Sequence, residues 1–272
     1  PTAVVKYKMT GDQDALRRGL QAANFLAGRF NPAGQYIRAW NEHLHGYAII
    51  DGMLNISLLF WASSVTGDPR YRHIAVRHAL TTMTRGVRAD GSVKHILSFE
   101  PTTGQFLEAV AGQGASPDSS WSRGTAWALY GFANTYRHSG ELRFLDTAKK
   151  VAHYFIAALP DDYVPYWDLR LESLDGEPRD SSAAAIAASG LLEIADAVSP
   201  SESRTYRLAA HRIIQSLTEH YSALSMPEHD AILLHATGHR PINGAVDVSL
   251  IYGDYFYVEA VAKLCGWKYR IY

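Results

Sequence analysis

The feature that most constrains this chain is a short turn that recurs between segments of helical periodicity. Residues 10–12, 66–68 and 139–141 read Thr-Gly-Asp, Thr-Gly-Asp and Ser-Gly-Glu, and each triplet separates two apolar-periodic segments. Glycine suits the position after a helix because it adopts a left-handed backbone conformation, and an acid suits the start of the next helix. Each turn therefore predicts a hairpin of two α-helices.

The two helices of each predicted hairpin differ in character. Residues 126–133, Ala-Trp-Ala-Leu-Tyr-Gly-Phe-Ala, are apolar on nearly every side, whereas the helix after each turn carries its charges on one face. A helix that is apolar all round is enclosed, and an amphipathic helix faces water. Repeated hairpins that alternate the two types predict an all-α fold in two concentric layers, an α/α toroid.

We expect about nine helices and a single domain over residues 1–272, since no linker divides the pattern. A looser turn, Ser-Pro-Ser at 199–201, separates one further pair. The long connections lead into the apolar helices, and loops of that length inside a compact domain are usually functional. The helices are expected near 2–9, 12–29, 51–65, 69–86, 121–138, 141–158, 180–197, 202–222 and 247–263, with long connections at 30–50, 88–120, 159–179 and 223–246.

The composition excludes several classes of partner. Lys and Arg number 26 against 27 Asp and Glu, for a net charge of −1, so the chain lacks the field that nucleic acids or anionic membranes require. It has no run of about eighteen apolar residues for a membrane span. Its only cysteine, Cys265, cannot form an internal disulfide, and the first ten residues do not resemble a signal peptide. We expect a cytoplasmic protein that binds neither nucleic acid nor membrane.

Asp118 is the first candidate for catalysis. It precedes a predicted enclosed helix, so capping of that helix is the simplest role for its carboxylate, with Arg123 as a surface partner. Ser119 and Ser120 could cap equally well, however. Burying a carboxylate beside Trp121 in an enclosed space costs free energy, which favours a functional role for Asp118.

Asp51 begins another predicted inner helix, and capping alone would also explain it. Two acids at equivalent positions of two inner helices would both point toward the mouth of a toroid. This arrangement can produce one carboxyl that holds a proton and one that stays ionised. Asp180 repeats the placement, but there capping is favoured, with Arg179 beside it to reach a substrate anion.

Other chemistries receive little support. His235 and His239 have ligand-like spacing, but Gly238 indicates a loop and no nearby carboxylate or thiolate completes a metal shell, so we expect no metal and no cofactor. The motifs of serine nucleophiles and nucleotide binding are absent. Tryptophans in or beside the long loops, at 40, 121 and 167, favour a sugar ligand because they offer flat apolar faces.

Six segments in order, with helical hairpins between them, resemble the unsaturated glucuronyl hydrolases of glycoside hydrolase family 88. The resemblance spans nearly the whole chain and implies an (α/α)6 toroid that removes a 4,5-unsaturated uronic acid from oligosaccharides made by polysaccharide lyases. Since the chain begins inside what resembles the family's early helical region, we expect a toroid incomplete at the N-terminus, as a monomer or homodimer. The segments are 50–55 (Ile-Asp-Gly-Met-Leu-Asn), 113–114 (Gln-Gly), 118–124 (Asp-Ser-Ser-Trp-Ser-Arg-Gly), 164–168 (Val-Pro-Tyr-Trp-Asp), 179–183 (Arg-Asp-Ser-Ser-Ala) and 249–255 (Ser-Leu-Ile-Tyr-Gly-Asp-Tyr).

The same resemblance implies roles for individual residues. Asp118 matches the family's general acid and base, and Asp51 matches its second essential aspartate. The implied reaction is hydration of the C4=C5 vinyl ether, with neither a metal nor a covalent nucleophile. Trp121 and Trp167 would stack on sugar rings. Weaker candidates for contacts to the substrate carboxylate or hydroxyls are Gln113, Arg179, His235 and His239.

Three alternatives stay open from the sequence. The unsaturated rhamnogalacturonyl hydrolases would share the toroid and the mechanism. A non-catalytic carbohydrate-binding protein would result if the missing segment abolished catalysis. A metal-dependent hydrolase ranks third.

Overall fold

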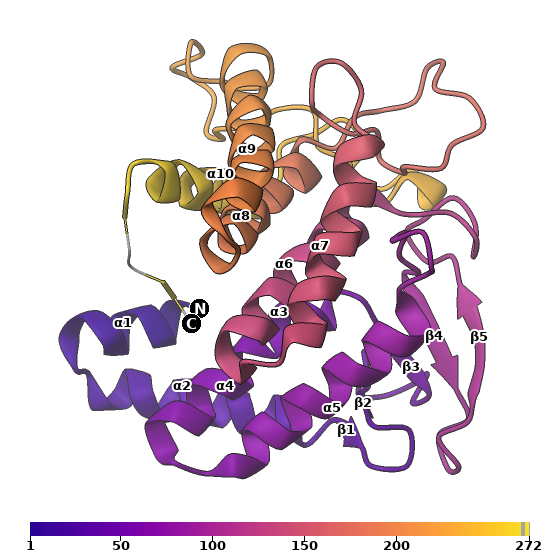
Figure 1. Cartoon of the computed structure of the whole chain (residues 1–272), viewed down its shortest axis with the longest axis vertical. Coiled ribbons are helices and arrows are strands. Elements are labelled where there is room, and N and C mark those ends of the chain that lie inside the picture. Colours follow the sequence, from indigo (N-terminus) through magenta and orange to yellow (C-terminus); the bar gives the residue numbers. More distant parts are fainter. Residues whose placement is uncertain (268–269, 272) are drawn as a thin grey trace.

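The computed structural model describes residues 1–267 and 270–271, most of which lie in helices (Figure 1). The helices and strands, in chain order, are α1 (Thr2–Thr10), α2 (Gln13–Ala27), β1 (Phe30–Asn31), β2 (Tyr36–Ile37), β3 (Tyr47–Ile49), α3 (Gly52–Asn55), α4 (Ser57–Thr66), α5 (Pro69–Gly86), β4 (Ile96–Phe99), β5 (Phe106–Val110), α6 (Ser122–Ser139), α7 (Leu142–Ala157), α8 (Ser181–Ala197), α9 (Pro200–His220), the 3-10 helix η1 (Arg240–Ile242) and α10 (Ile251–Leu264).

The helices form an inner and an outer layer, as the sequence predicts. In α8, 15 of the 17 residues are buried, whereas α9 buries 8 of 21. The inner helices α6, α8 and α10 pack in a row, and α7 and α9 cover α6 and α8 from outside (Figure 1). Unlike α6 and α8, α10 buries only 4 of its 14 residues. The inner helices therefore start together at one end of the molecule, the end at which the long connections meet them.

The hairpin turns follow the predicted rule. Gly11, Gly67 and Gly140 have φ between 71° and 76°, the left-handed region, and each donates its N–H to a carbonyl of the helix it ends. Asp12 and Asp68 cap α2 and α5 by accepting backbone N–H groups. The third acid does not cap its helix; it pairs with an arginine of the first turn instead.

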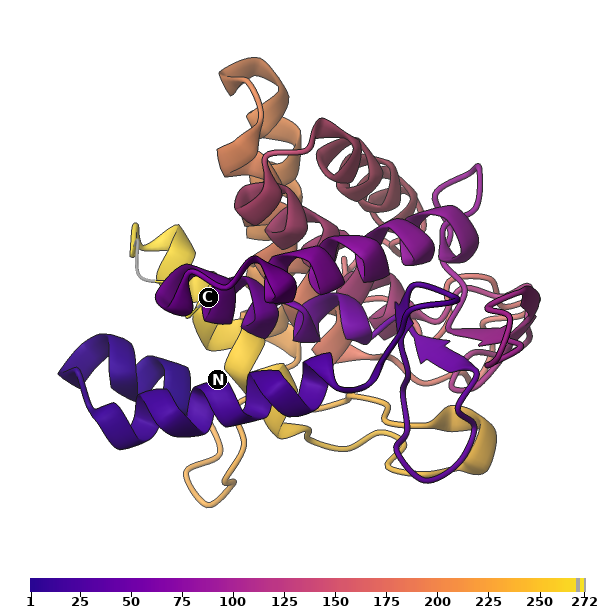
Figure 2. The same cartoon turned by 90° about the horizontal axis from the view of Figure 1, so that it is seen from below.

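Three expectations about secondary structure were wrong. The connection expected as a loop over 30–50 contains the antiparallel pair of β1 and β2 and then β3. The segment expected as one helix over 51–65 is divided into α3 and α4 by a turn at Ile56. The connection expected as a loop over 88–120 contains β4 and β5, which join β3 in a three-stranded antiparallel sheet with order β3-β4-β5. The sheet lies at one side of the helices in both views (Figures 1 and 2).

Two glycines allow the inner helices to approach closely. A Cβ added at Gly131 of α6 would lie 2.5 Å from the Cβ of Met53 and 2.7 Å from its backbone, and one at Gly190 of α8 would lie 2.9 Å from the Cα of Tyr130. A side chain at either position would therefore force the helices apart. Across the described residues, no helix is both long and apolar enough to span a bilayer.

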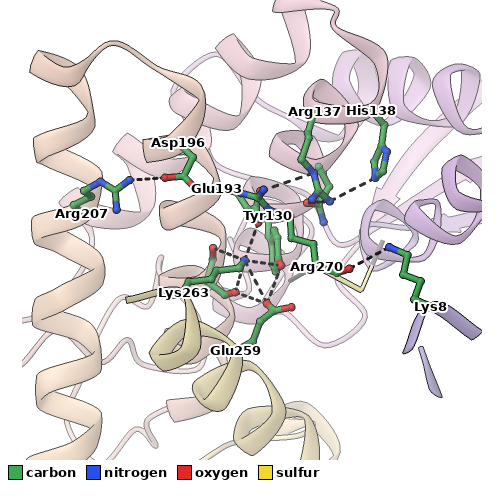
Figure 3. A network of polar contacts seen from close by, with 12 residues as sticks. Lys8, Tyr130, Arg137, His138, Glu193, Asp196, Arg207, Glu259, Lys263 and Arg270 are labelled. Carbon is green, nitrogen blue, oxygen red and sulfur yellow. Dashed lines mark hydrogen bonds and ion pairs between the residues drawn. The ribbon is translucent and has the colours of Figure 1, made fainter. Parts of the chain in front are cut away.

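An ionic network around the buried Glu193 ties the far ends of the inner helices together (Figure 3). Glu193 of α8 pairs with Lys263 of α10 at 3.0 Å and with Arg270 at 2.9 Å. Lys263 also donates to the Tyr130 hydroxyl at 2.8 Å, and Lys8 of α1 donates to the Arg270 carbonyl at 3.1 Å. The network therefore joins the first helix to the last described segment of the chain.

Glu193 and His78 are buried groups with strongly lowered pKa values, and burial also lowers the pKa of the half-buried His138 to about 4. Burial alone would raise the pKa of Glu193, but Lys263, Arg137 and Arg270 outweigh it and lower that pKa to about 2. Burial lowers the pKa of His78 to about 4, because its ring is enclosed beneath Gly52 and has the Ile37 N–H as its hydrogen-bond partner. The charge of each group therefore differs between the folded and the unfolded chain only between its lowered pKa and its usual one, which is about 2 to 4.5 for Glu193 and about 4 to 6.5 for His78.

We expect Gly131→Ala to destabilise the protein by about 1–3 kcal/mol, because the added methyl overpacks the contact with Met53. The free energy of unfolding from chemical denaturation measures this loss. Gly86→Ala is the matched control: it is also a buried helical glycine, but its Cβ would meet Thr82 and Leu97 at ordinary distances of 3.5 and 3.6 Å. Equal effects in the two variants would contradict close packing at Gly131.

We expect acid to destabilise the chain in two steps. Unfolding lets His78 take up a proton between pH 6.5 and about 4, which removes about 3 kcal/mol of stability over that range. Glu193 contributes a similar amount that is present above pH 4.5 and is lost as the pH falls toward about 2. Unfolding free energies measured from pH 7 to 3 test this.

The variant His78→Asn separates the first step, since its amide oxygen can still accept the Ile37 N–H but does not titrate. Its stability should fall less between pH 6.5 and 4 than that of the original chain. Parallel pH profiles for the two proteins would rule out His78 as a source of the acid sensitivity.

Candidate active site

A cavity of about 710 Å³ runs between the first two hairpins and the inner helices α6 and α10. Asp51 lines it beside the start of α3, with apolar side chains from α2, α4 and α6, Trp127 among them. The ionic network described above borders the same cavity, through Glu193 and Lys263. The cavity therefore extends from Asp51 to the far ends of the inner helices.

Asp51 does not cap its helix. Its backbone is helical, with φ −55° and ψ −30°, and its side chain accepts no hydrogen bond from the first turn of α3. Oδ2 is buried and has no hydrogen-bond partner, although the side chain is 30% exposed. The capping interpretation is therefore wrong for Asp51, and its carboxylate is available for another role.

His95 is the nearest ionisable partner of Asp51. Its Nε2 lies 3.6 Å from Asp51 Oδ2, and its ring packs 4.5 Å from the ring of Trp121. Its Nδ1 accepts the backbone N–H of Gln113 at 2.8 Å. Sequence reasoning left His95 without a role; its position within a long connection and just before an apolar run was the only available signal.

A buried ion pair joins the starts of two inner helices. Arg123 of α6 donates to Asp180 at 2.7 Å, and both side chains are almost fully buried. Asp180 also caps α8 through the Ala183 N–H, so the predicted capping role is confirmed. Arg123 further donates to the carbonyls of Thr237 and Gly238 at 2.5 and 2.6 Å. The predicted surface pairing of this arginine with Asp118 was wrong.

These contacts place residues 237–239 against the other site elements. The Gln113 side chain donates to the Gly238 carbonyl at 2.6 Å, which fixes the loop from a second direction. His239 follows, with a buried Nδ1 that has no partner. Burial lowers the pKa of His239, and the nearby His95 and Arg123 lower it further. Gln113, Trp121 and His239 therefore gather around His95, next to Asp51.

Tyr252 of α10 belongs to the same group; the sequence indicated it only as one of the aromatic residues near the long connections, without a specific role. Burial raises the pKa of its hydroxyl, against the effect of Arg123, and the nearby Asp180 and Asp51 raise it further. The Arg123 guanidinium lies 5.4 Å from its ring centroid. Its place near the start of an inner helix, like that of Asp51, was the signal in the sequence.

Asp118 lies on an exposed turn and does not line the cavity that holds Asp51. Its side chain is near Arg88 and Lys94, and its carbonyl accepts from Arg170 at 3.0 Å. The turn is held by the buried Asp168, whose carboxylate accepts the backbone N–H groups of residues 115, 120 and 170. Residue 121 is the cap position of α6, so Asp118 does not cap that helix.

The remaining candidates lie around a second hollow of about 700 Å³. Arg179 pairs with Asp162 at 2.9 Å, and exposed His235 pairs with Asp247 at 2.6 Å; both candidates line this hollow. Trp167 is buried and does not itself line the hollow. Its Nε1–H donates to Glu177, which does, at 2.6 Å. The candidates thus divide into a group around Asp51 and a group around the second hollow.

The first group combines the parts that acid–base chemistry on a sugar needs. Asp51 supplies a carboxylate, His95 and His239 supply imidazoles, and Trp127 supplies an aromatic side chain that lines the cavity. Trp121 is only 3% exposed, between His95 and the Arg123 guanidinium, so its ring offers no free face for the stacking on a sugar that the resemblance implies. In the described part of the chain, the His, Cys, Asp and Glu side chains form no cluster of three or more suited to a metal ion.

We expect Arg123→Met to destabilise the chain by about 3–5 kcal/mol, because it leaves Asp180 buried without its partner. Chemical denaturation measures the loss. Arg143→Met is the control, since Arg143 pairs with Glu141 on the exposed side of α7, and we expect its effect to stay below about 1 kcal/mol. A small loss at Arg123 would mean that the pair does not hold the site together.

Comparison with known proteins gives matches over nearly the whole chain. The family model described as Glycosyl Hydrolase Family 88 matches residues 1–264. An "Unsaturated chondroitin disaccharide hydrolase" from Streptococcus agalactiae is 38% identical over 269 residues, which are 97% of this chain and 67% of that protein. The chain therefore spans about two thirds of that relative's length.

Solved structures of unsaturated glucuronyl hydrolases are also similar to this chain. The crystal structure of the unsaturated glucuronyl hydrolase from Bacillus sp. GL1 has a TM-score of 0.93 at 36% identity, covering 96% of this chain and 71% of that one. An Asp-to-Asn variant of the Streptococcus agalactiae unsaturated glucuronyl hydrolase, complexed with dGlcA-GalNAc6S, has a TM-score of 0.82 at 34% identity and covers 98% and 67%. This chain shares its helical arrangement with both.

Proposed function

Because the chain belongs to glycoside hydrolase family 88, we propose that it removes a 4,5-unsaturated uronic acid from the end of an oligosaccharide. The observation that carries this proposal is the family match over residues 1–264. The partly sheltered carboxylate of Asp51, which lines a cavity next to an aromatic surface, supports it independently.

We further propose that the substrate derives from a glycosaminoglycan. The relative from Streptococcus agalactiae is named for chondroitin disaccharides, and the similar solved structure from that organism holds dGlcA-GalNAc6S. An unsaturated disaccharide offers one carboxylate, several hydroxyls and two ring faces. We propose that Gln113 and His239 contact the sugar next to Asp51, and that the group around Arg179 contacts a more distant part of the substrate. The buried Trp121 supports the ring of His95.

The proposed reaction is hydration of the double bond. A carboxylic acid donates its proton to C4 of the C4=C5 vinyl ether, and an oxocarbenium-like cation forms at C5. Water adds to C5 and gives its proton to the same carboxylate, which restores the acid. The resulting hemiketal opens and breaks its bond to the neighbouring sugar, which leaves as an alcohol.

We assign the acid and base role to Asp118 and the second essential role to Asp51, as the resemblance implies. Asp118 is exposed beside Arg88 and Lys94, so it can reach a substrate that enters from the loop side. Asp51 is half-buried, so it can hold the sugar from within the cavity. The two positions give the two carboxyls different access to solvent.

We also propose a compartment, a domain organisation and an oligomeric state for the protein. It acts in the cytoplasm, as a single catalytic domain and as a monomer or homodimer. The lone, unpaired Cys265 suits a reducing compartment. Sedimentation of the purified chain reports its oligomeric state.

We expect Asp118→Asn to lower kcat by about 100- to 10,000-fold, because an amide cannot transfer the proton to C4. The assay follows the loss of near-ultraviolet absorbance of the double bond in lyase-generated chondroitin, heparin and rhamnogalacturonan disaccharides. Asp51→Asn should also abolish turnover, whereas Asp146→Asn on the exposed face of α7 should not change it.

Each outcome decides a separate point. An active Asp118→Asn variant beside an inactive Asp51→Asn variant would transfer the acid and base role to Asp51. Turnover of the rhamnogalacturonan product alone would replace the glycosaminoglycan substrate. Disaccharide binding in calorimetry without any turnover by the unaltered chain would favour a carbohydrate-binding protein.

A further inference from the structure

The arrangement of His95 against Asp51 extends the proposed function, on which this inference rests. We propose that His95 is a positioning residue: its Nε2–H holds Oδ2 of Asp51, so that only Oδ1 of this carboxylate remains for the substrate. Oδ2 is buried and has no hydrogen bond in the free chain, while the side chain as a whole is 30% exposed toward the cavity. The exposed oxygen is therefore Oδ1.

The tautomer of His95 follows from its other ring nitrogen. The Gln113 N–H points at Nδ1 from 2.8 Å, and a donor at that distance needs a lone pair on the acceptor. The Ala111 carbonyl lies 3.2 Å from the same nitrogen, so the two backbone groups compete for opposite tautomers. The shorter contact selects the ring with its proton on Nε2, the nitrogen that faces Asp51.

Packing prevents the ring of His95 from turning away. Its side chain is 7% exposed, and the Trp121 ring lies 4.5 Å from it at 44°. Gly112 lies against the ring edge that carries Nδ1: its backbone is in the left-handed region, with φ +58°, and a Cβ there would lie 2.3 Å from Nδ1. Only glycine permits both that backbone conformation and that approach.

Two other ionisable side chains lie near His95, and neither supplies an acceptor for its Nε2–H. Arg123 of α6 is occupied by Asp180 and by the carbonyls of the loop at 237–238. His239 on that loop is close enough for its pKa to be lowered by His95. Asp51 of the α3 start is thus the carboxylate that the Nε2–H of His95 meets.

The distance explains how the contact acts during turnover. At 3.6 Å, Nε2 and Oδ2 are too far apart for a hydrogen bond, but catalytic contacts often tighten when the substrate binds. A sugar hydroxyl that donates to Oδ1 would fix the orientation of the Asp51 carboxylate, with Oδ2 pointing toward His95. His95 therefore acts through Asp51 and does not itself contact the substrate.

Two substitutions separate this role from simple anchoring of the loop. In His95→Gln, the amide N–H₂ can occupy the position of Nε2 and still donate to Asp51. In His95→Asn, the amide oxygen can occupy the position of Nδ1 and still accept the Gln113 N–H, but the donor to Asp51 is lost. We expect Gln to retain kcat about 10- to 100-fold better than Asn, with a smaller difference in KM.

The kinetic outcomes are decisive provided that both variants unfold at the same denaturant concentration as the unaltered chain. If Asn retains as much kcat as Gln, His95 anchors residues 111–113 and the proposal is overturned. Full activity of both variants overturns it as well.

A second measurement does not depend on turnover. The ¹⁵N shifts of the His95 ring, assigned by their loss in His95→Gln, should show the Nε2–H tautomer, and the Nε2 signal should shift in Asp51→Asn. An Nδ1–H pattern, or no response to Asp51→Asn, overturns the proposal. If the unaltered chain turned over none of the unsaturated disaccharides, the proposed function would fail while this spectrum still tested the contact.

Discussion

The buried ion pair between Arg123 and Asp180 is the interaction on which the rest of the site depends. It joins the starts of α6 and α8, and the same guanidinium holds the carbonyls of Thr237 and Gly238. Two buried charges are stable only when they meet each other and their remaining hydrogen-bond partners. The pair therefore fixes three chain segments at once, and His239 takes its place beside His95 as a result.

The hairpins could be predicted from sequence because each depends on neighbours within a few residues. Gly67 ends one helix and Asp68 caps the next, and both signals are local. The sheet could not be predicted in this way. Pairing of Ala48 with Leu97 and of Leu97 with Ala109 depends on contacts far apart in the chain, and four apolar residues at 96–99 do not by themselves specify a strand.

The site was only partly predictable for the same reason. Asp51 was found because it begins an inner helix, and the fold places every such start at one end. Its partner His95 was not assigned, since the two are 44 positions apart and a lone histidine has no distinctive spacing. The sequence also could not divide the polar candidates between two hollows, because Arg179 turns toward Asp162, a contact that depends on how the long connections fold.

The contact between Lys8 and the carbonyl of Arg270 has a consequence for how the molecule assembles. It links positions 262 residues apart, so nearly the whole chain must be in place before it can form. Contacts of such long range are formed late in folding because they close the largest loop. The end of the cavity that contains Asp51 also closes large loops, since Arg123 and Gln113 reach residues 237–238 over 114 to 125 positions. Both ends of the cavity therefore depend on segments from distant parts of the chain.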